Sequence, residues 1–396
     1  MKPGFDKKVI VIGGDHHNTL AVVRCLGKMH CNQFLLVHSN QKDDDSICIL
    51  RSKYIIGKTS CVSSSEEAIV QWLMDYASEE KTILFPCSDL AAYTIDANYD
   101  KLCDSYILPG FKDKPGEVVR LMDKWEQSEW AQEHGIPMAE TWKLKKAEQF
   151  EIPDDMVYPC IVKPEVSAFG SKGDITICAD CDALQTALEQ FVELGYTQLV
   201  CQRFLRKKYE ACAYGCIVDE YECCAGGMIE KIREFPPGGG GSLTYAKFID
   251  EPSVCILRDK ILDWLFKSGY RGQYDVELFV CEEGVYLNEI NFRHSGNGYA
   301  LVKNGVYAPY IWCVSVAGAD IGKKMKFRVK TGKHHMDEIA DLQQIKCGNI
   351  SVVKWIRDCF RTSAFAKWDM ADIKCTMAYY MPLIKRTTRK FFGKGR

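Results

Sequence analysis

Two neighbouring segments of the chain alternate in polarity and are rich in strand-forming residues, Tyr274–Phe279 and Val285–Phe292. The residues between them include Glu282–Gly284, and the final glycine accepts the left-handed conformation that a short hairpin loop requires. The pattern therefore predicts a β-hairpin. A three-residue loop pairs Cys281 with Val285, and this register decides which side chains face one another along both strands.

The predicted hairpin brings four polar side chains together. Glu277 lies directly opposite Glu289, and the alternation along a strand places Asn291 and Arg293 on the same face as Glu289. Two carboxylates that face each other across a sheet repel and destabilise it. A divalent cation between them removes this cost, and Mg²⁺ is the expected ion because the ligands are all hard oxygens. The hairpin thus predicts a metal–phosphate site.

Composition excludes several other classes of protein. The 396 residues allow two or three domains, and a formal net charge of −2 provides no basic excess for nucleic-acid binding. Without an apolar run of about 18 residues or a signal peptide, we expect a cytoplasmic protein. Its 20 cysteines are then expected to be reduced thiols. The Cys178–Cys181 motif and the pair Cys223–Cys224 lack a second pair at zinc spacing.

The N-terminal region alternates between short apolar strands and amphipathic helices. The expected elements, in chain order, are Lys8–Ile12, Thr19–Lys28, Phe34–Val37, Glu66–Ala77 and Thr82–Phe85. Strand–helix alternation at this spacing predicts an α/β domain with a mostly parallel sheet, which binds ligands at the carboxyl edge of its strands.

Several residues at that edge could either bind a ligand or have only a structural role. Gly13 lies in a Gly-Gly turn before a helix N-terminus and could hold an anion, although such turns are usually structural. Asp89 could contact a ligand or cap the helix that follows it. His16 and His17 could contact a substrate, but exposed loop histidines are more often inert.

Two lysines in the middle of the chain stand near a loop suited to polyphosphate. Lys124 lies in the predicted helix Val118–His134, and Lys163 ends the strand-like run Tyr158–Lys163. The small-residue loop Ser167–Gly173 leads into a returning strand, so its N–H groups and a nearby lysine could bind phosphates. The loop is not a Walker A motif, and a hairpin tip without a ligand is the alternative.

Two further segments suit a nucleotide and its substrate. The apolar strand Gln198–Leu205 leads into a linker whose exposed backbone could meet an adenine edge, and Glu210 follows it. Lys231 and Arg233 precede the four glycines Gly238–Gly241, which allow a close approach to a ligand. A flexible linker is the alternative, but the position between strands and the preceding charges favour a binding loop.

From about Val118 to Val306 the order of these motifs resembles the ATP-grasp superfamily. That superfamily includes the large subunit of carbamoyl phosphate synthetase and D-aspartate ligase-like amide ligases. Each motif is weak alone, but their common order and spacing are specific: Asp123-Lys124, Ile161-Val162-Lys163-Pro164, Gln202-Arg203-Phe204-Leu205, Lys208-Tyr209-Glu210, Asp275-Val276-Glu277 and Asn288-Glu289-Ile290-Asn291-Phe292-Arg293.

The resemblance implies a fold and its division into domains. The expected class is α/β (α+β), with an ATP-grasp fold preceded by a Rossmann-like pre-ATP-grasp domain and followed by a small extension. The implied domains are residues 1–115, residues 116–313 with a lid at about 140–205, and a C-terminal region at residues 314–396.

The resemblance also implies an ATP site. Lys124 and Lys163 would contact the phosphates beneath the glycine loop, and Glu210 would bind the ribose hydroxyls. The remaining residues implied for ATP binding are Ser167, Gly170 and Ser171 in the loop and Gln202, Arg203, Phe204 and Leu205 at the adenine. Gln202 stands where many relatives carry glutamate, but the adenine contact there is partly made by the backbone.

By the same resemblance, Glu277, Glu289 and Asn291 would hold one or two Mg²⁺ ions, with Mn²⁺ as a substitute. Catalytic roles would fall to Lys163, Arg233 and Arg293, the last stabilising the transferring phosphoryl group. The residues expected to hold the small-molecule carboxylate and amine substrates are Gly13, Asp89, Lys231, Arg233, Gly239, Gly240 and His294.

The implied activity is ATP-dependent carboxylate–amine ligation. A substrate carboxylate would take the γ-phosphoryl group to form an acyl phosphate, and an amine would then displace phosphate to form an amide. Two alternatives stay open: carboxyphosphate or carbamoyl phosphate chemistry, and a non-catalytic nucleotide-binding module. The sequence has no biotin-attachment motif and no glutaminase nucleophile, which makes carboxyphosphate or carbamoyl phosphate chemistry less favoured. The complete set of expected metal ligands argues against a non-catalytic module.

The C-terminal region is harder to interpret. Segments Phe327–Lys330, Ile339–Lys346 and Ser351–Phe360 predict a small mixed region packed on the catalytic core. The final residues carry six cations and no acid: Lys385, Arg386, Arg389, Lys390, Lys394 and Arg396. A solvated tail is the common outcome for such a run, and contact with an anionic membrane or an acidic partner is the alternative. A homodimer is compatible with the sequence.

Overall fold

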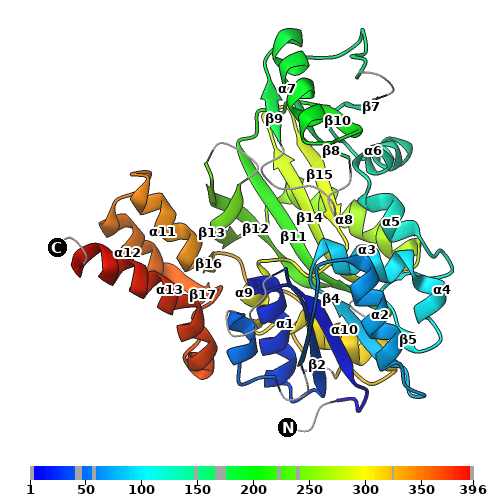
Figure 1. Ribbon diagram of the computed structural model, residues 1–396, viewed down its shortest axis with the longest axis vertical. Helices are drawn as coiled ribbons and strands as arrows, with labels where there is room; N and C mark the ends of the chain where they lie inside the picture. Colours follow the sequence, from blue (N-terminus) through cyan, green and yellow to red (C-terminus); the bar gives the residue numbers. More distant parts are fainter. Residues whose placement is uncertain are drawn as a thin grey trace.

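The computed structural model describes residues 4–40, 47–55, 59–146, 150–165, 175–220, 224–237, 241–322 and 325–392, with side chains as far as residue 384. A large sheet occupies the centre, with a small lid above it, an α/β domain below it and the C-terminal helices at one side (Figure 1). No helix in these ranges combines the length and apolar character of a membrane span. The cysteines in these ranges are all free thiols.

The N-terminal domain is built on five parallel strands, as the sequence predicts. Its elements are β1 (Val9–Gly13), α1 (His17–Lys28), β2 (Gln33–His38), η2 (Cys48–Arg51), β3 (Thr59–Val62), α2 (Glu66–Tyr76), β4 (Thr82–Pro86), α3 (Asp89–Ala97), α4 (Tyr99–Leu102) and β5 (Tyr106–Ile107). The strand order is β3-β2-β1-β4-β5. Alternate residues of β1 enter two different cores, because helices pack on both faces of the sheet. This order leaves the loops after β1 and β4 side by side at the carboxyl edge.

The lid is a separate antiparallel sheet with its own apolar core. Its elements are β7 (Thr141–Lys145), β8 (Cys160–Pro164), β9 (Thr176–Cys178), α7 (Cys181–Glu193) and β10 (Gln198–Arg203). The strand order is β7-β10-β8-β9, and α7 covers one face through Leu184, Leu188 and Phe191. The predicted phosphate loop Ser167–Gly173 lies outside the described residues.

The central sheet carries the predicted hairpin. Its strands are β6 (Gly110–Phe111), β11 (Tyr209–Ile217), β12 (Cys224–Phe235), β13 (Ser242–Phe248), β14 (Tyr270–Val280), β15 (Val285–Asn291), β16 (His334–Met336) and β17 (Thr362–Phe365). The order is β15-β14-β11-β12-β13-β16-β17, with β6 paired to β14. Helix α8 (Pro252–Lys267) packs on one face through Leu257, Ile261 and Leu265.

The hairpin register differs from the prediction at the loop and agrees with it at the site. Val280, not Cys281, pairs with Val285, and Cys281 instead donates its N–H to the carbonyl of Gly284. A register shift after Leu278 then restores the predicted pairing of Glu277 with Glu289. One extra residue on β15 forms this β-bulge, and a bulge is not visible in an alternating pattern.

The helix predicted over Val118–His134 is two helices, α5 (Glu117–Met122) and α6 (Lys124–Glu133). Asp123 separates them in an extended conformation, and its side chain accepts hydrogen bonds from the N–H groups of Trp125 and Glu126. An aspartate N-cap competes with helix continuation, which explains the break. As a result, Lys124 lies at the first position of a helix.

The sequence predicts a C-terminal region packed on the catalytic core, but part of this region belongs to the central sheet itself. Beyond α9 (Gly298–Lys303) and α10 (Ala308–Val316), strands β16 and β17 extend the central sheet itself. Three helices and one short turn complete the chain: α11 (Glu338–Lys346), α12 (Val352–Arg361), η4 (Met370–Asp372) and α13 (Ile373–Phe392). Phe327–Lys330 forms no strand and contributes only a bridge between Arg328 and Gly226.

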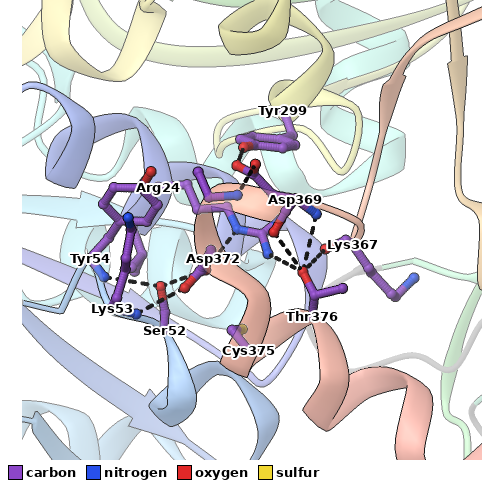
Figure 2. Close-up of polar contacts among 12 residues, drawn as sticks. Arg24, Ser52, Lys53, Tyr54, Tyr299, Lys367, Asp369, Asp372, Cys375 and Thr376 are labelled. Carbon is purple, nitrogen blue, oxygen red and sulfur yellow. Dashed lines mark hydrogen bonds and ion pairs between the residues drawn. The ribbon is translucent and has the colours of Figure 1, made fainter.

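A buried polar cluster fastens the start of α13 to the N-terminal domain (Figure 2). Nε of Arg24 on α1 lies 2.9 Å from Oδ2 of Asp372, and both side chains are fully buried. Asp372 also accepts hydrogen bonds from Ser52 and from the N–H of Lys53. The cluster therefore connects segments that lie almost 350 residues apart in the sequence.

Candidate active site

The metal end of the site lies on β14 and β15. Glu277 and Glu289 face each other across the two strands, and Asn291 lies two residues further along. Asn288 donates its side-chain N–H to Glu277 at 3.2 Å. Burial, together with the charges of Glu210, Asp275 and Glu289, raises the pKa of Glu277 to about 7. The negative charges of the neighbouring acids therefore outweigh the positive charge near Glu277.

A hard divalent cation fits this set of donors. Two carboxylates and one amide oxygen are ligands that Mg²⁺ prefers, and a cation would relieve the repulsion that raises the pKa of Glu277. Among the described residues, no three histidine, cysteine or acidic side chains are grouped as a metal site. A cation held by Glu277, Glu289 and Asn291 would therefore need further oxygens, which the phosphates of a nucleotide can provide.

Arg293 is held between two acids from different domains. Its Nη1 lies 2.7 Å from Oδ2 of Asp275, and its Nε lies 3.0 Å from Oδ1 of Asp89. Burial disfavours the charged guanidinium, but the two aspartates outweigh this effect and raise the pKa of Arg293. Arg293 thus connects the metal end of the central sheet to the carboxyl edge of the N-terminal sheet.

The capping alternative for Asp89 is wrong. The N-cap of α3 is Ser88, whose side chain accepts a hydrogen bond from the N–H of Ala91. Asp89 occupies the first position of the helix and pairs with Arg293 instead. This arrangement explains why an acid begins the helix that follows β4: it anchors the arginine of another domain.

Two lysines lie above the metal end. Lys163 is on β8 of the lid, and Lys124 begins α6, where its N–H donates to the carbonyl of Glu165 at 3.0 Å. Burial and the charge of Lys124 lower the pKa of Lys163 to about 8, whereas Glu289 and Glu277 act in the opposite direction. Lys163 is therefore close enough to Lys124, Glu277 and Glu289 for their charges to change its proton affinity.

A second cluster of charges lies on the neighbouring strands. Glu210 on β11 pairs across the sheet with Lys231 on β12, and the two side chains form an ion pair. Lys207 also reaches Glu210, with 2.8 Å between Nζ and Oε2. Burial favours the neutral acid, but Lys231 and Lys207 outweigh it and lower the pKa of Glu210. Glu210 is thus an ionised, well-oriented acceptor.

The predicted adenine linker begins in the lid sheet, where Gln202 and Arg203 end β10. Gln202 is buried and donates to the hydroxyl of Thr141 at 2.9 Å. The N–H of Arg203 donates to the carbonyl of Glu140, and the N–H of Phe204 donates to the carbonyl of Pro159. Leu205, the last residue of the linker, is also buried. The linker is therefore held firmly on both sides, and its adenine role stays a prediction.

Arg233 faces the C-terminal helices. Its guanidinium contacts Asp341 of α11 at 2.7 Å and Asp358 of α12 at 2.6 Å. It also stacks over the ring of Tyr245, with its Cζ 4.2 Å from the ring centre. Because both partners belong to the C-terminal helices α11 and α12 and not to the metal end, we correct the sequence-based expectation and leave Arg233 out of the proposed catalytic and substrate residues. Gly239 and Gly240 lie outside the described residues.

Gly13 is explained by packing. A Cβ at this position would lie 2.3 Å from Oγ1 of Thr19 and 2.8 Å from Cβ of Cys87. The hydroxyl of Thr19 donates to the carbonyl of Gly14, which closes the turn onto α1. The turn between β1 and α1 is therefore tight because of its neighbours, and no ligand is needed to explain the glycine.

The side chain of His294 is enclosed by the protein and is not exposed to a substrate. The ring is buried, and a Cβ on Gly298 would lie 1.9 Å from its Nε2. Burial and the neighbouring Arg293 lower the pKa of His294 to about 3. A neutral imidazole of such low basicity is a poor proton acceptor, so the structure argues against His294 as the base for the amine.

Solved structures of similar shape identify the fold. No family model matches the sequence, and a search of curated proteins gives no match. The N5-carboxyaminoimidazole synthetase of Staphylococcus aureus superimposes with a TM-score of 0.62 at 15% identity, covering 88% of this chain and 86% of that one. The chain has an ATP-grasp fold.

Two other ATP-grasp structures align over similar lengths. The L-amino acid ligase of Bacillus licheniformis gives a TM-score of 0.63 at 12% identity, covering 83% of this chain and 79% of that one. The biotin carboxylase of Campylobacter jejuni gives 0.60 at 13% identity, covering 82% and 74%. The S. aureus synthetase has also been solved with ADP. The ATP-grasp resemblance seen in the motifs is therefore confirmed at the level of the fold.

The sequence pattern missed two charged residues of the site. Asp275 lies two residues before Glu277 on the same face of β14, and that spacing in Asp-Val-Glu was the available signal. Lys207 precedes Glu210 by three residues, and nothing in the pattern distinguishes it from Lys208, whose Nζ lies 3.6 Å from the exposed Glu282. Both residues become significant only once the strands are placed side by side.

Proposed function

We propose that this protein is an ATP-dependent carboxylate–amine ligase that releases ADP and phosphate. The observation that carries the proposal is the electrostatic coupling of Lys163 to Lys124, Glu277 and Glu289 at one place in an ATP-grasp fold. Two cations and two acids at this junction can hold the phosphates of ATP and a divalent cation at the same time.

Each of these residues has a role in the proposed reaction. Lys163 and Lys124 bind the phosphates and orient the γ-phosphorus toward the carboxylate. Glu210, fixed by Lys231 and Lys207, accepts hydrogen bonds from the ribose hydroxyls. Arg293 lies beside the metal end and offsets the negative charge that develops on the transferring group.

Glu277, Glu289 and Asn291 would hold Mg²⁺, which supplies charge neutralisation at the phosphate oxygens when it is bound. The pair formed by Arg293 with Asp89 orients the arginine toward the N-terminal sheet. The carboxyl edge of that sheet is the place proposed for the carboxylate substrate, because ligands of parallel sheets bind there.

A carboxylation reaction is the second candidate. Two of the similar structures are an N5-carboxyaminoimidazole synthetase and a biotin carboxylase, so bicarbonate could be the carboxylate that is activated. In that case ADP would form with bicarbonate and an acceptor, without an organic acid. The two candidates use the same nucleotide site and differ only in the acid.

A screen of ADP release tests the proposal. The purified protein is incubated with Mg²⁺ and ATP and with pairs of amino acids or small organic acids and amines. We expect ADP to form only when both partners are present, and mass analysis should find an amide of the two. ADP formation with bicarbonate in place of the organic acid would favour carboxylation. No ADP formation across the screen would contradict both candidates and favour a nucleotide-binding module.

A further inference from the structure

Exposed apolar side chains concentrate at the C-terminal end of the chain. Among the described residues, nine of the sixteen large apolar side chains with high exposure lie between Val352 and Ile384. Figure 1 shows α11, α12 and α13 at the edge of the molecule, away from the lid. A soluble protein rarely gathers so much apolar surface in one region without an occupant for it.

Helix α12 carries the densest part of this surface. Four of its side chains form what we name the apolar ridge: Val352, Val353, Ile356 and Phe360. Their exposed fractions run from 46% at Ile356 to 89% at Phe360. At about 100° per residue, the four positions fall within about 100° of one another around the helix. The ridge is therefore a single outward-facing stripe about two and a half turns long.

A row of cations lies beside the apolar ridge. Three exposed residues of α12 form this cationic edge: Lys354, Arg357 and Arg361. Around the helix axis, these three positions lie between the apolar ridge and the side of α12 that packs against the protein. That inner side carries Asp358, which is buried and bound to Arg233. The ion pair fixes the rotation of α12, so the ridge and the cationic edge face outward.

The surrounding surface is also positive. After Met336 the chain contains six acids, and every one is buried: Asp337, Glu338, Asp341, Asp358, Asp369 and Asp372. Exposed cations in the same stretch include Lys346 and Lys374. The sequence after Ile384 adds six more cations and no acid. Since the acids face inward, the surface that this region presents is cationic and apolar.

We propose that this region docks on an anionic membrane surface through α12. The apolar ridge enters the boundary between headgroups and acyl chains, and the cationic edge binds the anionic headgroups. A second copy of the chain is a poorer occupant, because two such faces would bring like charges together. Nucleic acid is also poorer, because an outward stripe of apolar side chains has no counterpart along a phosphate backbone.

Vesicle flotation tests the proposal with the full chain. We expect the protein to float with vesicles of phosphatidylcholine and phosphatidylserine, to stay unbound with phosphatidylcholine alone, and to dissociate as salt rises. Absence of binding to the anionic vesicles would overturn the proposal. Equal binding to both kinds of vesicle would also overturn it, because the cations would then have no role.

Two variants separate the ridge from its charges. The double variant Val353→Ser/Phe360→Ser should reduce binding at least about tenfold, and Arg357→Glu should reduce it and weaken its salt dependence. The matched controls lie on α8, where Ile256 is 72% exposed. Ile256→Ser and Lys267→Glu should bind as the wild type does. Full binding by Val353→Ser/Phe360→Ser would overturn the proposal.

Two more measurements identify a different occupant and separate this proposal from the enzymatic one. If the wild type dimerises, fails to bind vesicles and becomes monomeric in Val353→Ser/Phe360→Ser, the ridge is a dimer interface and the membrane proposal is wrong. ADP formation without vesicles should be equal in the wild type and this variant. Vesicle binding does not depend on catalysis, so it can succeed or fail whatever the enzymatic screen shows.

Discussion

Glu277 and Glu289 face each other across β14 and β15, and the charges of both act on Lys163 of the lid. Such a pairing of like charges is unfavourable in an isolated sheet. Because Lys163 and Arg293 both feel the charge of Glu277, we propose that the repulsion serves to bind a cation beside the phosphates of a nucleotide.

The first prediction concerns the repulsion itself. Glu289→Gln should stabilise the metal-free protein by about 0.2–1 kcal/mol, because it removes one of two facing charges. The same variant should lose the rise in melting temperature that Mg²⁺ and a non-hydrolysable ATP analogue cause in the wild type. Thermal unfolding with and without these ligands measures both effects. Glu283→Gln in the exposed hairpin loop is the control; an unchanged ligand effect in Glu289→Gln would refute the metal assignment.

The second prediction is the pH dependence of the metal-free protein. The pKa of Glu277 rises from an ordinary value of 4.5 to about 7 in the folded state. A raised acid pKa means that the folded protein binds the proton more tightly, so stability falls as pH rises from about 4.5 to 7. Above pH 7 the penalty is complete. Bound Mg²⁺ should remove it and release a proton, and its affinity should fall below pH 7.

Chemical denaturation between pH 5 and 8 measures the second prediction, with Glu277→Gln as the comparison. The glutamine variant cannot titrate at this position, so its stability should change less over this range. Wild-type and variant curves of the same slope would show that Glu277 does not titrate near neutral pH.

The third prediction concerns Lys163. Burial and Lys124 lower its pKa to about 8, so the protonated form that attracts phosphate is lost as pH rises through this value. ADP affinity without Mg²⁺ should therefore fall between pH 7 and 9. In Lys163→Gln the ADP affinity should be at least about tenfold lower at pH 7, and it should change less between pH 7 and 9. Isothermal titration calorimetry measures it, and Lys145→Gln on β7 is an exposed control. A pH profile of wild-type shape in Lys163→Gln would contradict the assignment.

The fourth prediction concerns the buried pair of Arg24 and Asp372 (Figure 2). Asp372→Asn leaves a fully buried guanidinium without its counter-charge, which should cost about 3–5 kcal/mol of stability. Asp263→Asn breaks the exposed pair with Lys267 and should cost less than about 1 kcal/mol. Urea denaturation of both variants gives the comparison. Equal losses would mean that the C-terminal cluster does not stabilise the N-terminal domain.

The parts that sequence predicts well are those in which pattern and chemistry agree. The apolar strand predicted at Lys8–Ile12 corresponds to β1, because fully buried strands read as continuous apolar runs. The strand predicted at Tyr158–Lys163 overlaps β8. The pairing of Glu277 with Glu289 is also found. The β-bulge that produces it is not predictable from the pattern, since the loop register and the site register differ by one residue.

The parts that sequence misses depend on contacts between distant segments. Arg233 precedes a glycine loop, which suggests a ligand, yet its partners Asp341 and Asp358 lie more than 100 residues later. His294 follows Arg293 directly, and only the packing of Gly298 shows that its ring is enclosed. A local pattern cannot reveal the partner of a charge when that partner comes from another part of the chain.

The central claim is that a substrate carboxylate accepts the γ-phosphoryl group before the amine attacks, and one measurement tests it most directly. Once the screen has found an acid and an amine, the acid is labelled with ¹⁸O in its carboxylate and turned over with Mg²⁺ and ATP. The account predicts that one ¹⁸O atom appears in the released inorganic phosphate for each amide formed. Amide formation with no ¹⁸O in the phosphate would contradict it.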